Sequence, residues 1–235
     1  MSEIIYGKNV CLEAISSKRK INVIYTTSNN TEIIELSKKN NIDYKIVEKK
    51  FLDKLVTGFH QGVCLEVEEY QYYDLKEVVS KLDKKLGFLV ILDGIEDPHN
   101  FGAILRTCEA AQVDGVIIPK NRSVQVNNTV AKVSTGAVEY VKVIKVANVV
   151  QTIKYLKENG YWIVGAEAGE KSVNYTDVKY DMKIALVIGS EGKGISRLVT
   201  ESCDYLVKIP MKGHLTSLNA SVSTGILIYE IIKYR

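Results

Sequence analysis

Long apolar runs are missing from this chain of 235 residues, and so are the features of a secretory leader. No stretch approaches the ~20 consecutive apolar residues that a membrane-spanning helix needs. Residues 1–10 also lack the basic flank and the apolar segment of a signal peptide. The hydrophobic fraction of 46% is still enough to form a core. We therefore expect a soluble, cytoplasmic protein.

Cysteine and histidine are scarce, which limits the chemistry that the chain can support. The four cysteines are far apart and form no C-x-x-C pair: Cys11, Cys64, Cys108 and Cys203. They fit free thiols in a reducing compartment better than disulfides or a zinc site. The three histidines show no metal-ligand spacing: His60, His99 and His214. Since a G-x-S-x-G turn is also missing, we expect no metal and no hydrolase of these types.

A strong excess of charge of one sign is absent as well, because the net charge is only +3. Residues 1–80 carry 11 lysines and arginines against 12 aspartates and glutamates, whereas residues 81–235 carry 20 against 16. The basic excess therefore lies in the second part of the chain. This distribution is compatible with a local nucleic-acid footprint, and equally with an enzyme that acts on a neutral substrate.

The first part of the chain predicts a small α/β domain over residues 1–70. Helical patterns alternate with strand patterns, the helices at 7–19, 30–41 and 50–58 and the strands at 21–27, 43–49 and 62–70. A charged, tyrosine-rich segment follows at 71–85 and predicts a linker that contains a short helix.

The remainder, residues 86–235, predicts a larger α/β domain with a parallel sheet. Six short, continuously apolar runs alternate with helical patterns, at 88–95, 114–119, 141–146, 161–166, 183–189 and 205–210. Continuous apolar strands indicate a sheet that helices cover on both faces. Ligands of such sheets bind beyond the carboxyl ends of the strands. The candidate chemistry should therefore lie where these strands end.

Three strand ends are followed by unusual residues. After the first strand, "DPHNFGAILRT" gives Asp97 as a helix cap and Pro98 as the first helical residue. Asn100 lies in the first turn, beside free backbone N–H groups. Capping does not explain Arg106 further along this apolar helix. For Arg106 alone, a surface or salt-bridging role is equally compatible with the spacing.

The second strand end is the glycine loop "IGSEGKGIS", residues 188–196. Closely spaced glycines let a backbone approach a ligand or take positive φ. The loop matches neither a P-loop nor the dinucleotide fingerprint G-x-G-x-x-G. Taken alone, it is also compatible with a tight turn between a strand and a helix.

The third strand end leads into the last helix through "KGHLTSLNASVSTG", residues 212–225. Ser217 and Ser221 are four residues apart and share a helix face, with Asn219 near them. One such residue would serve as an N-cap, but a cap does not require this many. The surplus predicts a polar pocket wall at the start of the helix.

In this order, the three stretches resemble the three motifs of the SpoU branch of the SPOUT RNA methyltransferases, TrmH/RlmB-like. "DPHNFGAILRTCEAAQVDGVI" is similar to motif 1, "LVIGSEGKGIS" to motif 2 and "IPMKGHLTSLNASVSTGILIYE" to motif 3. "YGKNVCLEAI" and "HQGVCLEV" in the front segment look like the RNA-recruiting domain of the same group.

The resemblance implies a fold, a cofactor and a reaction. Residues 1–70 would be an N-terminal α/β RNA substrate-binding domain, and residues 86–235 a catalytic α/β domain whose C-terminal segment threads a loop as a trefoil knot. The protein would use S-adenosyl-L-methionine to methylate a ribose 2′-hydroxyl in RNA. Members of the family are homodimers with the active site at the subunit interface.

The resemblance also favours guanosine in large-subunit rRNA as the target. Methylation of tRNA and a non-catalytic RNA-binding protein that kept the fold are the alternatives. A nicotinamide or nucleotide enzyme on a doubly wound sheet is disfavoured, because the glycine fingerprint is missing.

Residue by residue, the motifs imply three sets of site residues. The catalytic set is Asn100, Arg106, Glu191, Ser217 and Asn219. The residues expected against the cofactor are Gly189, Gly192, Ile209, Met211 and Leu218. The candidate RNA contacts are His60, Gln61 and Gly62. Because arginine stays protonated, we expect Arg106 to hold a phosphate and orient the hydroxyl.

Overall fold

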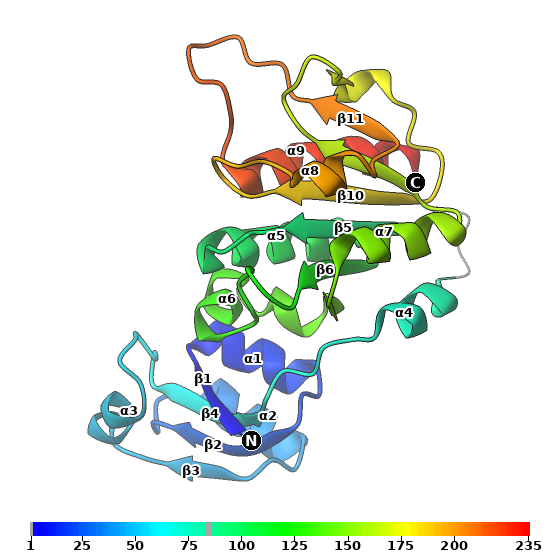
Figure 1. Cartoon of the computed structure of the whole chain (residues 1–235). Coiled ribbons are helices and arrows are strands. Elements are labelled where there is room, and N and C mark those ends of the chain that lie inside the picture. The colour runs from blue at the N-terminus through cyan, green and yellow to red at the C-terminus, as the bar shows by residue number, and fades with distance from the viewer. Residues whose placement is uncertain (1, 83–85) are drawn as a thin grey trace. The chain divides into compact units, whose positions relative to one another are not determined.

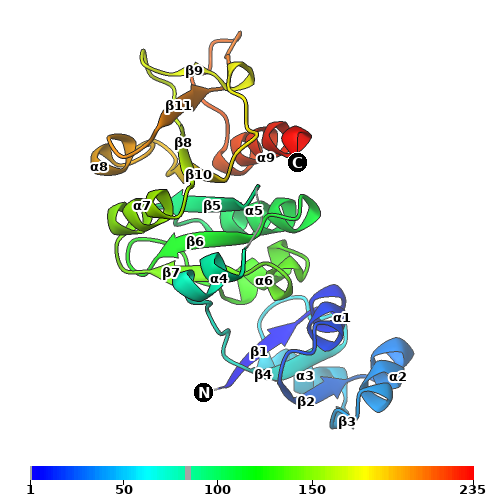
Figure 2. The same cartoon turned by 90° about the vertical axis from the view of Figure 1, so that its right-hand side faces the viewer.

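Figures 1 and 2 show the computed structural model of the chain, which describes residues 2–82 and 86–235. The chain divides into two compact units, and each unit combines two segments. The first unit comprises Met1–Gln71 and Val126–Tyr140, and the second comprises Tyr72–Gln125 and Val141–Arg235. Residues 83–85 of the predicted linker lie outside the described residues.

The first unit is built on a four-stranded mixed sheet with the strand order β1-β4-β2-β3. Its strands are β1 (Ser2–Tyr6), β2 (Ile21–Thr26), β3 (Tyr44–Ile46) and β4 (Val63–Glu68). Its helices are α1 (Lys8–Ser16), α2 (Thr31–Lys39), α3 (Lys49–Leu55), α6 (Asn128–Val133) and the 3₁₀ helix η1 (Ala137–Glu139). The predicted helices and strands of this part are confirmed, and β1 is an additional strand.

The segment that carries α6 and η1 belongs to the first unit. Val130 and Ala131 of α6 are buried, and α6 packs against β1. Glu139 accepts a hydrogen bond from Arg19 Nη1 at 2.6 Å. Burial raises the pKa of the Glu139 carboxyl, and the charge of Arg19 offsets part of this effect. Residues 126–140 therefore pack in the first unit although they lie within the predicted 86–235 domain, whose bounds stay a prediction.

The second unit holds a parallel sheet of seven strands in the order β7-β6-β5-β10-β8-β11-β9. The strands are β5 (Phe88–Asp93), β6 (Gly115–Pro119), β7 (Val143–Val146), β8 (Trp162–Ala166), β9 (Val173–Asn174), β10 (Ile184–Gly189) and β11 (Tyr205–Lys208). The helices are α4 (Leu75–Lys81), α5 (Pro98–Ala110), α7 (Val149–Glu158), α8 (Arg197–Thr200) and α9 (Ala220–Ile231), with the 3₁₀ helices η2 (Tyr175–Asp177) and η3 (Ile232–Tyr234). The α/β class and its parallel sheet are confirmed. The threading of the C-terminal segment through a loop stays a prediction.

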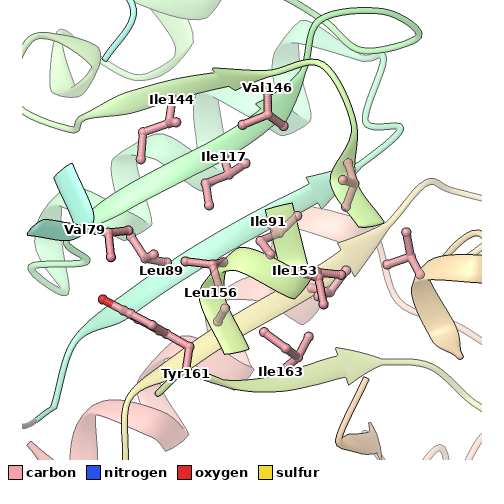
Figure 3. Packing of buried hydrophobic residues seen from close by; sticks show 14 of the residues in the cluster. Val79, Leu89, Ile91, Ile117, Ile144, Val146, Ile153, Leu156, Tyr161 and Ile163 are labelled. Atoms are coloured by element: carbon pink, nitrogen blue, oxygen red, sulfur yellow. The ribbon is translucent and has the colours of Figure 1, made fainter. Parts of the chain in front are cut away.

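One hydrophobic core lies between the sheet and helices α4 and α7. Figure 3 shows Leu89 and Ile117 of the sheet packed with Val79 of α4 and with Ile153 and Leu156 of α7. Burial of each such side chain contributes roughly 1.5–3 kcal/mol to folding. Because α4 packs into this core, residues 72–82 of the predicted linker belong to the second unit.

Helices cover both faces of the sheet, as the continuously apolar strands predict. Figure 2 shows α7 on one face and α5 and α9 on the other, and α5 and α9 pack against each other. Parallel strands end at a common edge, so the loops after β5, β6, β10 and β11 gather there. Three of these loops are the stretches that stood out in the sequence.

Candidate active site

A carboxylate and two amides form one hydrogen-bonded cluster at the carboxyl edge of the sheet. Glu191 Oε1 accepts hydrogen bonds from Asn100 Nδ2 at 3.0 Å and from Asn219 Nδ2 at 2.6 Å. Asn219 Nδ2 also donates to Asn100 Oδ1 at 2.9 Å. We call Asn100, Glu191 and Asn219 the Asn–Glu–Asn cluster. Each of its side chains is hydrogen-bonded to the other two, so the polar groups are preorganised. The cluster joins three of the five predicted catalytic residues.

The sequence around Asn100 fixes this residue at the start of α5. The side chain of Asp97 caps the helix by accepting a hydrogen bond from His99 N at 3.0 Å, and Pro98 opens the helix. The predicted capping is therefore confirmed. Asn100 is only 7% exposed, so its amide needs the hydrogen bonds that Glu191 and Asn219 supply.

The polar start of α9 has several separate roles. Asn219 is the N-cap, and its Oδ1 accepts from Ser221 N at 2.9 Å and Ser221 Oγ at 2.6 Å. Thr224 Oγ1 is buried and donates to Ala220 O at 2.6 Å. The side-chain oxygen of Asn219 thus accepts a hydrogen bond from the free N–H at the start of the helix, and its nitrogen donates to Glu191 and Asn100. Ser217 precedes the helix and is exposed.

The glycine loop after β10 presents Glu191. Ser190 N donates to Gly194 O at 3.0 Å, and Gly194 N donates to Ser190 O at 2.9 Å. A Cβ on Gly189 would overlap the backbone of Gly194, so only glycine fits there. Gly192 has φ +79°, a left-handed conformation that favours glycine. The glycines therefore make a tight loop that holds Glu191 beside the two asparagines.

A cavity of about 850 Å³ lies beside the Asn–Glu–Asn cluster. All five predicted cofactor residues line this cavity: Gly189, Gly192, Ile209, Met211 and Leu218. So do Ser217, Asn219 and Glu191. Ile188, Val207 and Leu227 give it apolar walls. The structure therefore brings the two predicted sets together at one place, apart from Arg106.

Sequence reasoning did not single out part of this lining. Ala166 is the last residue of β8, Glu167 and Ala168 follow it, and all three line the cavity. Glu167 Oε2 accepts a hydrogen bond from Thr200 Oγ1 at 3.0 Å. The rule that ligands bind beyond strand ends applies to "YWIVGAEAG" as well, and it would have indicated these residues.

Arg106 lies apart from the other predicted catalytic residues. It is exposed, six positions after Asn100 on α5, which turns its side chain roughly 120° away around the helix. Arg106 lines neither the cavity of about 850 Å³ nor a second one of about 620 Å³ at this edge of the sheet.

The three candidate RNA contacts form a turn in the first unit. His60 is 4% exposed; its Nδ1 accepts from Gly62 N at 2.9 Å, and its Nε2 lies 3.0 Å from Asp53 Oδ1. Gln61 is exposed, and its Oε1 accepts from Lys8 N at 2.9 Å. Gly62 has φ +78°. His60 thus uses both ring nitrogens inside the unit, and Gln61 is the outward-facing member of the three.

The cysteines are free thiols, as expected. Burial raises the pKa of Cys64 to about 11 and that of Cys203 to about 12. Within residues 2–82 and 86–235, no group of three or more histidine, cysteine, aspartate or glutamate side chains is placed to hold a metal. No helix in the same ranges is both long and apolar enough to cross a membrane.

Two solved structures share this fold over nearly the whole chain. The AdoMet-bound rRNA methyltransferase from Sinorhizobium meliloti superposes with a TM-score of 0.85 at 22% identity, over 99% of this chain and 87% of that chain. The SpoU methyltransferase AviRb from Streptomyces viridochromogenes, in complex with AdoMet, gives a TM-score of 0.85 at 20% identity, over 99% and 90%. These two likenesses show that the chain shares their α/β fold.

Sequence comparison gives the family. The sequence model of the SpoU rRNA Methylase family matches residues 87–229, and that of RNA 2′-O ribose methyltransferase substrate binding matches residues 4–73. YacO of Bacillus subtilis (strain 168), whose name assigns it to the TrmH family of tRNA/rRNA methyltransferases, is 43% identical over 240 residues, 99% of this chain and 96% of YacO. The chain belongs to the SpoU rRNA Methylase family, and the resemblance seen in its three motifs is confirmed.

Proposed function

We propose that this RNA methyltransferase transfers a methyl group from S-adenosylmethionine to a ribose 2′-hydroxyl, that of a guanosine in large-subunit rRNA. The observation that carries the proposal is the Asn–Glu–Asn cluster beside the 850 Å³ cavity. Two comparisons support it: the substrate-binding model that matches residues 4–73 refers to 2′-O ribose methyltransferases, and the S. meliloti neighbour is an rRNA methyltransferase. With RNA as its substrate, the protein would act in the cytoplasm.

The residues of the larger cavity fit S-adenosylmethionine. Its volume suits a nucleoside-sized ligand, and the apolar walls made by Ile188, Val207 and Leu227 suit a nucleobase. The backbone around Ile209 and Leu218 lines the same space and can hydrogen-bond a ligand. When bound, this cofactor supplies an electrophilic methyl group carried on a sulfonium.

The chain's own residues would mainly align and hold the acceptor. Glu191 and Asn219 line the cofactor cavity, so their fixed side chains can orient a hydroxyl at its edge. No side chain of the Asn–Glu–Asn cluster has to reorganise, because its hydrogen bonds are already formed. The guanidinium of Arg106 would hold an adjacent phosphate in its planar fork.

The position of Arg106 supports a homodimer with a shared active site. Arg106 is exposed on α5, away from the cavity of its own subunit, so a second copy can present it. Val222 and Tyr229 of α9 are 50% and 51% exposed, and α9 packs on α5. Exposed apolar side chains of this size suit an interface between copies. We therefore assign Arg106 to the site of the partner subunit.

The first unit would grip the RNA. Recognition of one ribose in a long RNA requires contacts to shape, and a 2′-hydroxyl distinguishes RNA from DNA. The RNA contacts at His60, Gln61 and Gly62 stay a proposal. We propose that the exposed Gln61 contacts the RNA, while the buried His60 and Gly62, with its left-handed backbone conformation, fix the turn.

Methyl transfer from labelled S-adenosylmethionine tests the function. Unmodified rRNA and tRNA are incubated with the protein, and the products are identified as nucleosides by mass spectrometry. We expect 2′-O-methylguanosine from rRNA, and none with Arg106→Ala. If the same nucleoside forms from tRNA alone, tRNA replaces rRNA as the proposed substrate. If the protein neither transfers a methyl group nor binds the cofactor, the enzyme proposal is overturned, and a non-catalytic RNA-binding protein is favoured.

A further inference from the structure

A second cavity, of about 620 Å³, opens at the carboxyl ends of β5 and β6. Asn100 lines it, and Glu191 lines both this cavity and the 850 Å³ cavity. Ser190, Lys193 and Gly194 are also common to both linings. The two cavities therefore meet at the glycine loop and at the Asn–Glu–Asn cluster.

The second cavity combines cationic and anionic groups. Arg122 and Lys193 are exposed cations in its lining. Besides Glu191, its lining has three carboxylates, and two of these serve the backbone: Asp93 Oδ2 accepts from Ser196 N at 2.7 Å, and Asp97 Oδ1 accepts from His99 N at 3.0 Å. The third, Glu96, is exposed. A nucleotide suits this mixture better than a simple anion, because it offers both a phosphate and base amino groups.

The loop that carries Arg122 is held in place. Arg122 has φ +55°, a backbone conformation that residues other than glycine rarely adopt. The residues after it are tied to the β5 end, with Val124 N donating to Ile95 O at 2.9 Å and Ser123 Oγ to the same oxygen at 3.2 Å. Of the five other non-glycine residues with positive φ, Gln61 lies in the turn before β4, and four follow helix ends, where this conformation is common: Lys18, Asn41, Gln112 and Thr135. Arg122 instead follows a strand at the ligand edge of the sheet.

We propose that the 620 Å³ cavity is the acceptor subsite, which binds the target ribonucleotide of the RNA. Arg122 binds a phosphate that flanks this nucleotide, Lys193 adds a second cation, and Glu96 accepts hydrogen bonds from amino groups of the base. The ribose then lies against Asn100 and Glu191, where the two cavities meet. This inference rests on the proposed function, because it takes the larger cavity as the cofactor site.

Arg122→Ala tests the phosphate contact through RNA binding, which needs no turnover. Filter binding with unmodified rRNA should give a Kd about tenfold higher and a salt slope smaller by about one. The Kd for S-adenosylmethionine should not change. The matched control is Arg197→Ala, an exposed arginine outside both linings that pairs with Glu201 at 2.7 Å. An RNA Kd for Arg122→Ala within twofold of this control would overturn the inference.

Asn121→Trp tests the cavity itself, because this exposed residue lines the 620 Å³ cavity but not the larger one. We expect weaker RNA binding with S-adenosylmethionine binding retained, whereas Gln151→Trp, at an exposed position of α7, should bind both as the wild type does. Unchanged RNA binding by Asn121→Trp would overturn the subsite. If the wild type binds RNA and transfers no methyl group, the proposed function fails, while the RNA-binding comparison still decides the subsite.

Discussion

At the scale of single residues, Asn219 joins the last helix to the site. Its oxygen accepts the N–H of Ser221, and its nitrogen donates to Glu191 and Asn100. Serine is a good N-cap, but it lacks the amide nitrogen that reaches the carboxylate. Substitutions at this position can therefore separate helix capping from chemistry.

We predict that Asn219→Ser and Asn219→Ala differ in stability but not in activity. Both variants leave Oδ1 of the buried Asn100 without the donor that Asn219 supplies. The alanine variant also loses the cap, so its unfolding free energy should be about 1 kcal/mol below that of the serine variant. Both variants lose the link to Glu191 and should transfer methyl groups at least tenfold more slowly. Urea unfolding and single-turnover methylation measure the two effects. Wild-type turnover of Asn219→Ser would contradict the role of the amide.

The raised pKa of the Cys203 thiol leads us to predict a loss of stability at alkaline pH. Burial raises the pKa of its thiol from 9.0 to about 12. Above pH 9 the unfolded chain loses this proton before the folded chain does, so the free energy of unfolding falls by up to about 1.4 kcal/mol per pH unit. Urea unfolding at pH 8, 9 and 10 should show a shallower decline for Cys203→Ala. Ser202→Ala controls for a local change without a thiol, and equal slopes in all three proteins would refute the prediction.

At the scale of elements, the glycine loop after β10 depends on one close approach. A Cβ on Gly189 would overlap the backbone of Gly194, so the loop that presents Glu191 would have to shift. A backbone cannot move aside as a flexible side chain can. The loop itself therefore makes Gly189 necessary, before any ligand is considered.

We predict that Gly189→Ala lowers the unfolding free energy by more than about 1 kcal/mol and abolishes S-adenosylmethionine binding. Gly213→Ala is the control, because its Cβ would meet nothing within 4 Å and its φ is not positive. Calorimetric unfolding and titration with the cofactor measure both quantities. Normal cofactor binding by Gly189→Ala would show that the loop tolerates the shift.

The sequence predicts the elements whose signals are local. The six apolar runs of the second unit became strands, and Asp97 and Asn219 cap helices. β1 was not predicted, because a five-residue strand is stabilised by pairing with β4, some 60 positions away. The packing of α6 in the first unit also depends on residues far apart in the sequence. Arg19 and Glu139 are 120 positions apart, and no pattern in the sequence indicates that they meet.

The same limit applies to the site. The motifs indicated Asn100, Glu191 and Asn219 because each follows a strand end, and these three residues form the Asn–Glu–Asn cluster. Arg122 also follows a strand end, but it carries no glycine or capping signal and was not singled out. His60 is a candidate RNA contact whose buried ring forms hydrogen bonds with Gly62 and Asp53, and its contact with RNA stays a prediction. Spacing shows where a residue lies along the chain but not which way its side chain points.

At the scale of the whole molecule, the two units cannot be separated by one cut. The first unit includes residues 126–140, which lie within the chain segment of the second. Deleting residues 1–80 would also remove Val78 and Val79, which belong to the core of the second unit. RNA gripping by the first unit is therefore better tested with point variants in the full chain than by truncation.

Arg106 leads to a prediction about the complete assembly. If each site takes Glu191 from one subunit and Arg106 from its partner, an Arg106→Ala subunit paired with a Glu191→Ala subunit has one intact site. Random pairing in an equal mixture should then restore roughly a quarter of wild-type methyl transfer, since half of the dimers are mixed and each has one of two sites.

The control for this mixture pairs two variants with defects on the same side of the site. Glu191 and Asn219 line one cavity of one subunit, so a dimer of Glu191→Ala with Asn219→Ala has two damaged sites and should stay inactive. The measurement is methyl transfer after co-refolding each pair. Activity in the first mixture and none in the second would assign Arg106 to the partner's site. If both mixtures are inactive, Arg106 acts in the site of its own subunit, and α5 would have to rotate when RNA binds.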